Sequence, residues 1–363
     1  MIDQHTVADA LGLAVAAGVP ALLWGAPGTG KTSVVRALAD ALDLPCEVVI
    51  ASIREPADFA GLPIVDAGQV SFAPPSWARR LADVEHGLLF LDEISTAPPA
   101  VQAALLRVVL ERTVGDLTLP AGIRTVAAAN PPEQAADGWD LSAPLANRFV
   151  HLDWPVDART MAEGFAGGWP PPTPVKLAAD WEWLVPQTRA WVAGFVGVRP
   201  GAVLSVPTEA VSAGRAWPSP RSWDMAARLL AAGRVADSSE DVVALLMKGC
   251  VGDGMGVEFL AWLAEGDLPD PEVVLADPDS FELPERGDRA FAALTAIAAA
   301  VAAQPTVQRW NAAWKVFGRA GDTAPDAAAV AARTLVRSRP DGAPVPPEVA
   351  QFAPMLQAAG LLG

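Results

Sequence analysis

The sequence is poor in the residues that build zinc sites and disulfide frameworks. Its 363 residues include two cysteines, Cys46 and Cys250, and three histidines, His5, His86 and His151. None of them has a Cys or His neighbour at the spacing of the usual zinc motifs. We therefore expect no zinc site and two reduced, buried thiols, as in a cytoplasmic protein.

Basic residues are also scarce. The chain has 26 Lys and Arg residues against 42 Asp and Glu residues, which gives a formal net charge of -16. Proteins that bind nucleic acids usually carry a basic surface. The composition therefore argues against a nucleic-acid partner and favours a protein or a small molecule.

Long apolar runs are missing as well. The first ten residues, "MIDQHTVADA", have neither the basic nor the apolar region of a secretory signal peptide. The nearest candidate for a membrane span, residues 290–303, is shorter than the ~20 residues that a span needs. We expect a packed helix there and a protein without a membrane part. Since the chain is 52% hydrophobic, two or three units with substantial cores are expected.

What the sequence does contain is a complete phosphate-binding loop. "GAPGTGKT" fits the pattern G-x-x-x-x-G-K-[ST], with the apolar strand "ALLW" before it and the helix "TSVVRALADAL" after it. The loop backbone and the helix N-terminus would direct N–H groups at a phosphate. Lys31 is expected to reach the β- and γ-phosphates and Thr32 to bind Mg²⁺, so ATP and Mg²⁺ are the expected cofactors. The predicted nucleotide-binding residues are Gly25, Ala26, Pro27, Gly28, Thr29, Gly30, Lys31, Thr32 and Ser33.

Two carboxylates end a second apolar run, "LLFLDE". At the end of a buried strand, Asp92 would stand beside the triphosphate and help to hold Mg²⁺. Glu93 would then be free to polarise the attacking water. The second acid favours hydrolysis over transfer of the phosphoryl group to a metabolite.

Three polar residues lie farther along the chain. Asn130 ends the apolar run "TVAAAN", where its amide could reach the γ-phosphate or the water, although an Asn before two prolines is also common in turns. Arg148 stands just before a predicted strand and Arg221 at the start of a predicted helix. A cation at a helix N-terminus is unfavourable unless something such as a phosphate compensates it. Each arginine could also be a solvated surface charge.

Apolar runs that alternate with helical segments predict an α/β fold with a parallel sheet buried on both faces. The insert Ser52–Trp77 is too long for a plain connection, and "PIVDAGQVSF" within it predicts a hairpin. After the proline-rich stretch "GGWPPPTP" the chain is mostly helical. The predicted division is an α/β core over residues 1–166, a helical lid over 167–266 and a helical extension over 267–363.

The order of these motifs resembles the MoxR branch of the AAA+ ATPases, in the helix-2-insert clade. The segment "ISTAPPAVQAALLRVVLERTV" is similar to the stretch that follows the two acids in that family. The resemblance covers residues 6–266. It implies an AAA+ P-loop NTPase core with a parallel sheet, followed by an all-helical lid, and leaves the role of the last ~100 residues open.

The resemblance also implies roles for single residues. Asn130 resembles sensor 1, Arg148 the arginine finger that completes a neighbouring subunit's site, and Arg221 sensor 2. The insert Ser52–Trp77 is similar to the one that members use near the pore of a ring, and residues 114–124 resemble the hairpin before sensor 1.

Assembly and partners are implied in the same way. Members of the branch form hexamers and remodel protein clients, often together with a von Willebrand A-domain protein. The sequence departs from the family at Arg107, where many relatives have an acid; Arg107 and Arg112 would be intersubunit contacts or part of a solvated face. We expect a ring-forming ATPase with a chaperone-like function. The alternatives are a nucleic-acid-linked AAA+ motor and a P-loop kinase or switch without motor action.

Overall fold

The computed structural model describes residues 3–66, 68–131, 139–169, 171–265 and 268–361. The chain forms two compact units. The first contains Met1–Ala178 and Leu204–Val257, and the second contains Ala179–Val203 and Glu258–Gly363. Each unit is assembled from two segments that are not adjacent in the sequence.

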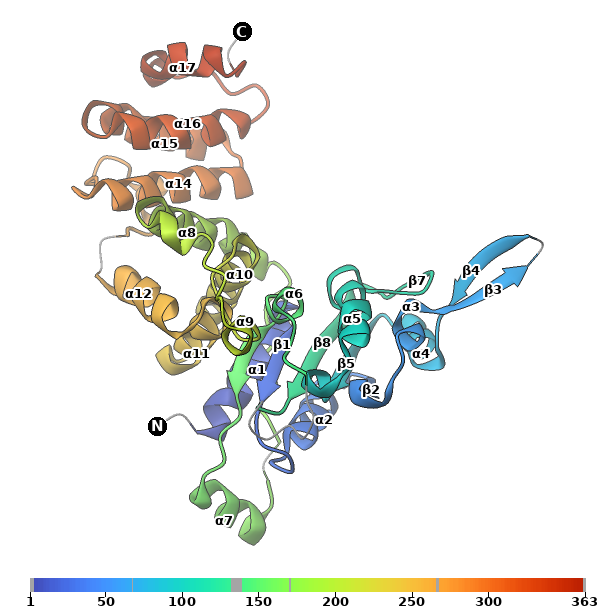
Figure 1. Ribbon diagram of the computed structural model, residues 1–363. Coiled ribbons are helices and arrows are strands. Elements are labelled where there is room, and N and C mark those ends of the chain that lie inside the picture. Colours follow the sequence, from blue (N-terminus) through green and yellow to red (C-terminus); the bar gives the residue numbers. More distant parts are fainter. Residues whose placement is uncertain (1–2, 67, 132–138, 170, 266–267, 362–363) are drawn as a thin grey trace. The chain divides into compact units, whose positions relative to one another are not determined.

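A five-stranded parallel sheet lies at the centre of the first unit (Figure 1). The carboxyl ends of parallel strands share one edge, so the residues that follow the three central strands meet there. These residues are the phosphate loop, Glu93 and Asn130. The predicted parallel sheet is confirmed. In spatial order the strands are β2 (Cys46–Ile50), β5 (His86–Asp92), β8 (Gly122–Ala129), β1 (Ala21–Trp24) and β9 (Val150–Asp153).

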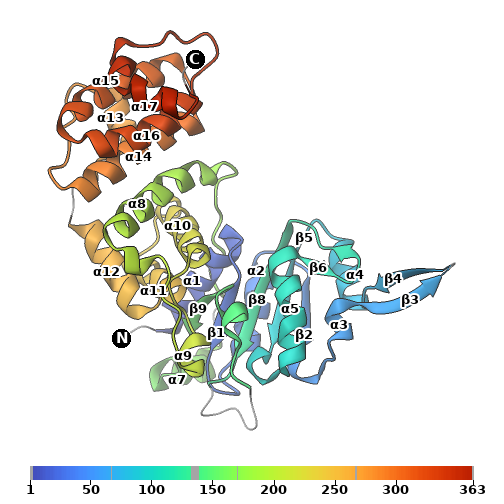
Figure 2. The ribbon, with the colours of Figure 1, turned by 45° about the horizontal axis from the view of Figure 1, so that its top comes forward.

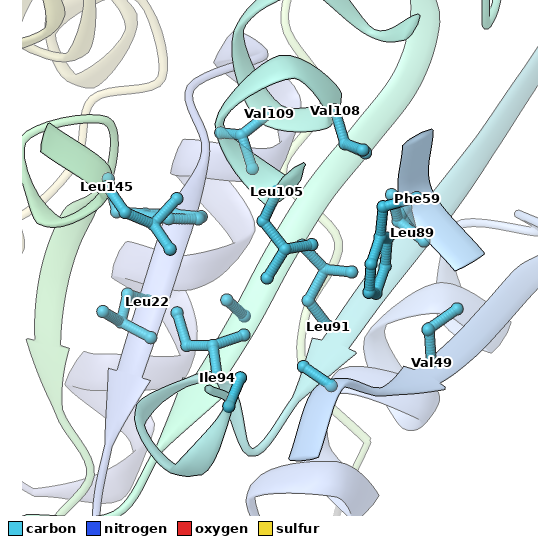
Figure 3. Packing of buried hydrophobic residues seen from close by; sticks show 14 of the residues in the cluster. Leu22, Val49, Phe59, Leu89, Leu91, Ile94, Leu105, Val108, Val109 and Leu145 are labelled. Atoms are coloured by element: carbon cyan, nitrogen blue, oxygen red, sulfur yellow. The ribbon is translucent and has the colours of Figure 1, made fainter. Parts of the chain in front are cut away.

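The core of this unit follows from the alternation of side chains along the strands. Leu89 and Leu91 of β5 point to the same face as Leu22 of β1, and this face packs against Leu105 of the helix α5 (Pro99–Glu111) (Figure 3). The inner strands β1 and β5 are buried on both faces. This explains why their sequences read as continuous apolar runs.

Helices surround the sheet. The first helix, α1, is capped at its C-terminus by Gly18 with a left-handed φ of 70°. It packs with α10 and α11, and α11 also contacts β9. The helices of this unit are α1 (Gln4–Ala17), α2 (Lys31–Ala41), α3 (Ala57–Ala60), α4 (Ser76–Ala82), α5, α6 (Ala143–Ala146), α7 (Ala158–Gly167), α9 (Ala210–Ala213), α10 (Pro220–Val235) and α11 (Glu240–Val251).

Two hairpins complete the first unit, and both were predicted. The strands β3 (Leu62–Asp66) and β4 (Gln69–Ala73) pair antiparallel within the insert, and β6 (Thr113–Val114) pairs with β7 (Leu117–Thr118). The β3–β4 hairpin projects away from the sheet (Figure 1). Its apolar side chains stay exposed, with Val65 at 74% and Val70 at 60% of full exposure.

The second unit is helical over its described residues (Figure 2). The expected packed helix near residue 290 is α14, which contacts α8 and α16. A separate core forms around Leu294, Trp310, Trp314 and Phe317, so this unit does not depend on the sheet for its apolar burial. Its helices are α8 (Val185–Val198), α13 (Pro271–Ala276), α14 (Gly287–Ala303), α15 (Val307–Thr323), α16 (Pro325–Arg337) and α17 (Ala353–Ala358); α12 (Asp253–Ala264) starts in the first unit and ends in this one.

The predicted lid, residues 167–266, is shared between the two units. Its helices α10 and α11 belong to the first unit, whereas α8 packs on α14 in the second. The helical character predicted for this region and for the C-terminal residues is confirmed. The division into three domains at residues 166 and 266 stays a prediction.

Two further expectations concern the membrane and the thiols. In the described part of the chain no helix is both long enough and apolar enough to cross a membrane. Cys46 and Cys250 are free, as expected. Cys250 is buried, but Cys46 is only half-buried, because β2 is an edge strand of the sheet.

Candidate functional site

The phosphate loop joins β1 to α2 and needs glycine at two positions. Gly28 and Gly30 have φ values of +77° and +93°, which side chains other than glycine rarely adopt. A Cβ atom at either position would meet no heavy atom within 4 Å, so the space beside the loop is open. The Gly25 amide donates to the Ala129 carbonyl at 3.1 Å and ties the start of the loop to β8.

Lys31 links the loop to the next strand end. Its Nζ donates to the carbonyl oxygens of Gly25 at 2.6 Å and Ala26 at 2.9 Å, and to the side-chain oxygen of Asn130 at 3.0 Å. Burial lowers the pKa of Lys31, and the negative charges of Asp92 and Glu93 oppose this shift. Two residues predicted to meet the same phosphate thus lie in direct contact, although they are 99 positions apart.

Asn130 is held in place by Ser95. The backbone N–H of Asn130 donates to Ser95 Oγ at 3.2 Å, and Ser95 Oγ donates back to the backbone carbonyl of Asn130 at 3.3 Å. The side-chain amide of Asn130 is therefore directed at Lys31 rather than used in a local turn. The sequence alone left these two roles open.

The predicted metal ligands are also neighbours. Thr32 Oγ1 donates to Asp92 Oδ2 at 2.9 Å, and Asp92 Oδ1 accepts from the Glu93 amide at 3.0 Å. Mg²⁺ prefers oxygen ligands and is usually held by one or two protein groups together with water and phosphate oxygens. A hydroxyl and a carboxylate in this arrangement fit that requirement. The described residues contain no larger cluster of His, Cys, Asp and Glu that could hold a metal.

Glu93 occupies an unusual backbone conformation. Its φ of 57° lies in the left-handed region, which costs a non-glycine residue about 1–3 kcal/mol and is typical of functional positions. Its carboxylate accepts a hydrogen bond from the Ser52 hydroxyl, and its carbonyl accepts one from Thr96 Oγ1 at 3.0 Å. The sequence interpretation missed Ser52 as a partner of Glu93, and only its place directly after β2 could have indicated it.

Arg148 and Arg221 lie close to each other. Burial lowers the pKa of Arg148, the positive charge of Arg221 lowers it further, and Glu111 opposes both effects. One guanidinium nitrogen of Arg148 donates to the Pro144 carbonyl, while its Nε is buried without a hydrogen-bond partner. In the described part of the chain, neither arginine hydrogen-bonds to the phosphate loop.

Two further arginines, Arg107 and Arg112, are exposed. Arg107 Nε lies 3.2 Å from Glu111 Oε2 on the surface of α5, as expected for a solvated face. Arg112 ends α5 with a left-handed φ of 54°. Glu111 thus interacts with both Arg107 and Arg148, and Arg148 also lies near Arg221. We name these four residues, Arg107, Glu111, Arg148 and Arg221, the arginine cluster.

A cavity of about 490 Å³ opens beside the phosphate loop. Its walls include Gly28, Gly30 and Val34 on one side and Trp154 and Phe165 on the other. The Trp154 indole donates to the Thr29 carbonyl at 3.0 Å, which fixes this wall to the loop. The volume lies within the range of small-molecule sites. The sequence interpretation did not include Trp154 or α7 in the site.

His151 is a structural residue below the loop. Its Nδ1 accepts from the Trp24 indole at 2.9 Å, and its Nε2 lies 2.9 Å from the Ala146 carbonyl, so a neutral ring with the proton on Nε2 satisfies both contacts. Burial lowers the pKa of His151 to about 4. Arg215 covers the Trp24 ring, and its guanidinium carbon lies 4.0 Å from the centre of that ring.

Comparisons with known proteins agree with this geometry. Residues 20–149 match the family model for the AAA domain of the dynein-related subfamily. The chain is 35% identical over 121 residues to the DNA-binding transcriptional activator HyfR of Escherichia coli K12, which covers 30% of this chain and 18% of the relative. It is 32% identical over 168 residues to the Psp operon transcriptional activator of the same organism, covering 40% of this chain and 50% of the relative. This chain therefore spans at most half the length of these two relatives.

Among solved structures, a candidate ATPase from Cytophaga hutchinsonii ATCC 33406 is 20% identical with a TM-score of 0.43, covering 67% of this chain and 79% of the other. A full-length MCM homolog from Methanopyrus kandleri is 21% identical with a TM-score of 0.38, covering 72% and 55%. The match of residues 20–149 to an AAA domain agrees with the parallel sheet and the phosphate loop of the α/β core.

Proposed function

Because residues 20–149 match an AAA domain, we propose that this chain hydrolyses ATP and assembles into a ring that remodels a protein client. The observation that carries the proposal is the convergence of Lys31, Thr32, Asp92 and Asn130 at the mouth of one loop. These residues come from three strand ends of one sheet, and each contact between them is direct. A chance glycine loop would not bring a lysine, a carboxylate and an amide together in this way.

Each side chain has a distinct task. Lys31 would neutralise the β- and γ-phosphates, and Asn130 would orient the γ-phosphate or the attacking water. Thr32 and Asp92 would hold Mg²⁺, which when bound supplies positive charge to the phosphate oxygens. Glu93 would accept the proton of the attacking water, once its carboxylate leaves Ser52.

The adjacent cavity offers a place for the rest of the nucleotide. It is continuous with Gly28 and Gly30, so a base bound there would leave its phosphates at the loop. Trp154 contributes an aromatic wall, and its contact with Thr29 couples that wall to the loop. We propose that the base of ATP occupies this cavity.

The arginine cluster supports the ring. A chain with a net charge of -16 places Arg148 close to Arg221, and the Nε of Arg148 is buried without a hydrogen-bond partner. An anion that approaches this pair of arginines would stabilise them and could satisfy the Nε of Arg148. The γ-phosphate of a nucleotide in the neighbouring subunit is that anion in our proposal, which requires head-to-tail contacts that close into a ring, such as a hexamer.

The exposed β3–β4 hairpin would contact the client. Its outward apolar side chains suit an unfolded or loosely specified peptide. The insert Ser52–Trp77 has one basic residue, Arg54, so it lacks the charge that a phosphate backbone requires. We propose a protein client, with a von Willebrand A-domain protein as the partner that the family resemblance implies.

One observation favours a second candidate. The chain is similar to a protein described as a DNA-binding transcriptional activator, although the match covers 30% of this chain. A nucleic-acid-linked motor would therefore share this core. Stimulation of ATP hydrolysis by DNA or RNA would support the second candidate and contradict the first.

The deciding experiment compares the wild-type chain with Glu93→Gln and with the exposed control Glu85→Gln. We expect phosphate release from ATP in the presence of Mg²⁺, reduced about 10²- to 10⁴-fold by Glu93→Gln with ATP binding retained. Glu85→Gln should behave like the wild type. Sizing of Glu93→Gln in saturating ATP should show a ring. A monomer at micromolar concentration would contradict the assembly, and near-normal turnover would contradict the role of Glu93.

A deletion tests the client. Removal of residues 61–68 should leave basal hydrolysis intact and abolish remodelling, since the hairpin lies outside the residues that would contact the nucleotide. Circular dichroism provides the control for folding. If the deletion unfolds the chain, replacing Val65 and Val70 by serine removes the exposed apolar surface without shortening the hairpin.

A further inference from the structure

The second unit contains a large groove that is separate from the nucleotide site. Its volume is about 1070 Å³, and it lies between the end of α8, the segment 282–291 and the start of α16. This volume exceeds that of most small-molecule sites, which measure roughly 300–1,000 Å³. The groove is therefore large enough for a segment of protein chain.

The walls of the groove are apolar. Val196 and Val198 contribute from α8, Leu283 from the loop before α14, and Val330 from α16. Val198 is 45% exposed and Val330 is 50% exposed, so the core of the unit buries only part of each side chain. Gly197 leaves part of the α8 wall open, because a Cβ atom there would meet nothing within 4 Å.

The charges of the groove are all of one sign. Four lining residues are acids and none is Lys or Arg. Asp288 is already compensated, since it accepts from the Trp262 indole at 2.7 Å and from Arg286 at 2.9 Å. Glu282, Glu285 and Asp326 are exposed and form no ion pair with the described residues.

Helix stabilisation explains only part of this charge. Asp326 lies in the first turn of α16, where an acid interacts favourably with the helix dipole. Glu282 and Glu285 precede α14 in a loop and have no such role. A basic, partly apolar ligand would complement the carboxylates of Glu282 and Glu285 together with the exposed apolar wall of the groove.

We propose that this groove binds a basic amphipathic helix of a partner protein. The walls are helices, and the described residues of this unit include no strand whose edge could pair with an extended peptide. A bound segment would therefore have to satisfy its own backbone hydrogen bonds, which a helix does. Its apolar face would contact Val198 and Val330, and its Lys or Arg side chains would reach Glu282 and Glu285.

The site differs from the proposed client-binding hairpin in chemistry and position in the chain. The hairpin belongs to the first unit and the groove to the second. A second copy of this chain is a poor occupant, because a net charge of -16 would oppose its approach to an acidic groove. The inference does not depend on ATP hydrolysis.

The test uses the full chain and two labelled synthetic peptides of about four helical turns. Both carry leucine at helical spacing; one has lysine at the flanking positions and the other has glutamate. Fluorescence anisotropy should show that the lysine peptide binds, with a Kd on the order of 10 µM, and that the glutamate peptide binds at least about tenfold more weakly. Added salt should weaken the binding of the lysine peptide, since the flanking charges are exposed.

Two variants and a control locate the binding site. Gly197→Trp places a bulky side chain in the groove, at a position where a Cβ atom would meet no heavy atom within 4 Å. The double change Glu282→Lys and Glu285→Lys reverses the charge at both positions. Each variant should weaken binding of the lysine peptide at least about tenfold. Gly201→Trp is the control, because Gly201 is also in open space but does not line the groove. Equal binding of both peptides, no binding, or binding unchanged by Gly197→Trp would overturn the proposal. Self-association that Gly197→Trp abolishes would also overturn it, since a second copy would then be the occupant.

Discussion

The Ser52 hydroxyl donates a hydrogen bond to the Glu93 carboxylate, which ties the proposed water-activating acid to the first residue of the insert. The other end of the insert is tied as well. The Phe72 amide donates to Asp116 Oδ2 at 2.6 Å, and the Asp116 amide donates to the Phe72 carbonyl at 3.0 Å. Asp116 lies in the β6–β7 turn, and β8 follows this hairpin in the chain. The insert is thus hydrogen-bonded to Glu93 through Ser52, and its hairpin is hydrogen-bonded to the β6–β7 turn.

We predict that Ser52→Ala raises basal ATP hydrolysis several-fold, up to about tenfold, with little change in KM. A carboxylate held by Ser52 must break that bond before it can polarise water. Because the bond is exposed, we take its net value as about 1 kcal/mol, which corresponds to about fivefold in rate. Steady-state phosphate release would measure the effect. A fall in kcat would show instead that Ser52 aligns Glu93 for catalysis.

We predict that Lys31→Ala abolishes ATP binding. Lys31 is a buried cation whose ammonium group is held against the phosphate loop. Alanine at this position would remove the positive charge that we expect to bind the phosphates. Titration with a fluorescent ATP analogue would measure the loss. Lys176→Ala is the matched control, because Lys176 is exposed and has no contact with the loop in the described structure. Retained affinity in Lys31→Ala would remove this residue from the site.

We predict that Arg148 acts on the site of a neighbouring subunit. An arginine that stabilises the transition state from outside is worth about 10³–10⁵ in rate, so Arg148→Ala should be nearly inactive alone. Mixing it with Lys31→Ala subunits should restore part of the activity, because some interfaces then combine an intact loop with an intact arginine. Co-assembly must be verified by sizing. Co-assembled mixtures that stay inactive would contradict a shared site.

We predict that acid destabilises the first unit through His151. The pKa of His151 is about 4 in the folded chain against an ordinary value of 6.5, so the unfolded chain binds the proton more strongly. The contribution to the free energy of unfolding, up to about 3 kcal/mol, is therefore present above pH 6.5 and is lost as the pH falls towards 4.

Thermal melting between pH 7.5 and pH 4.5 would test the role of His151. His151→Gln should be less stable at pH 7.5, where it lacks the Trp24 contact, but should lose less stability over this pH range. His86→Gln, a change at an exposed histidine, should keep the acid sensitivity of the wild type. An unchanged pH dependence in His151→Gln would assign the effect to other groups.

Several elements of the fold could be predicted from local patterns in the sequence. The strand, glycine loop and helix around Lys31 are specified by neighbouring residues, and so are the apolar run before Asp92 and the turn of the β3–β4 hairpin. A buried parallel strand must be apolar on both faces, and a phosphate loop must have glycine where φ is positive. These requirements act over a few residues and are therefore visible without a structure.

The contacts between residues far apart in the chain could not be predicted from such local patterns. The contact of Ser52 with Glu93, the arginine cluster around Glu111 and the wall that Trp154 adds beside the loop join segments far apart in the chain. The same holds for α8, which follows the core in sequence but packs on α14 in the second unit. Helix-forming patterns specify an apolar face without specifying what it packs against. That choice depends on the shapes and charges of all the surfaces that the folded chain brings together.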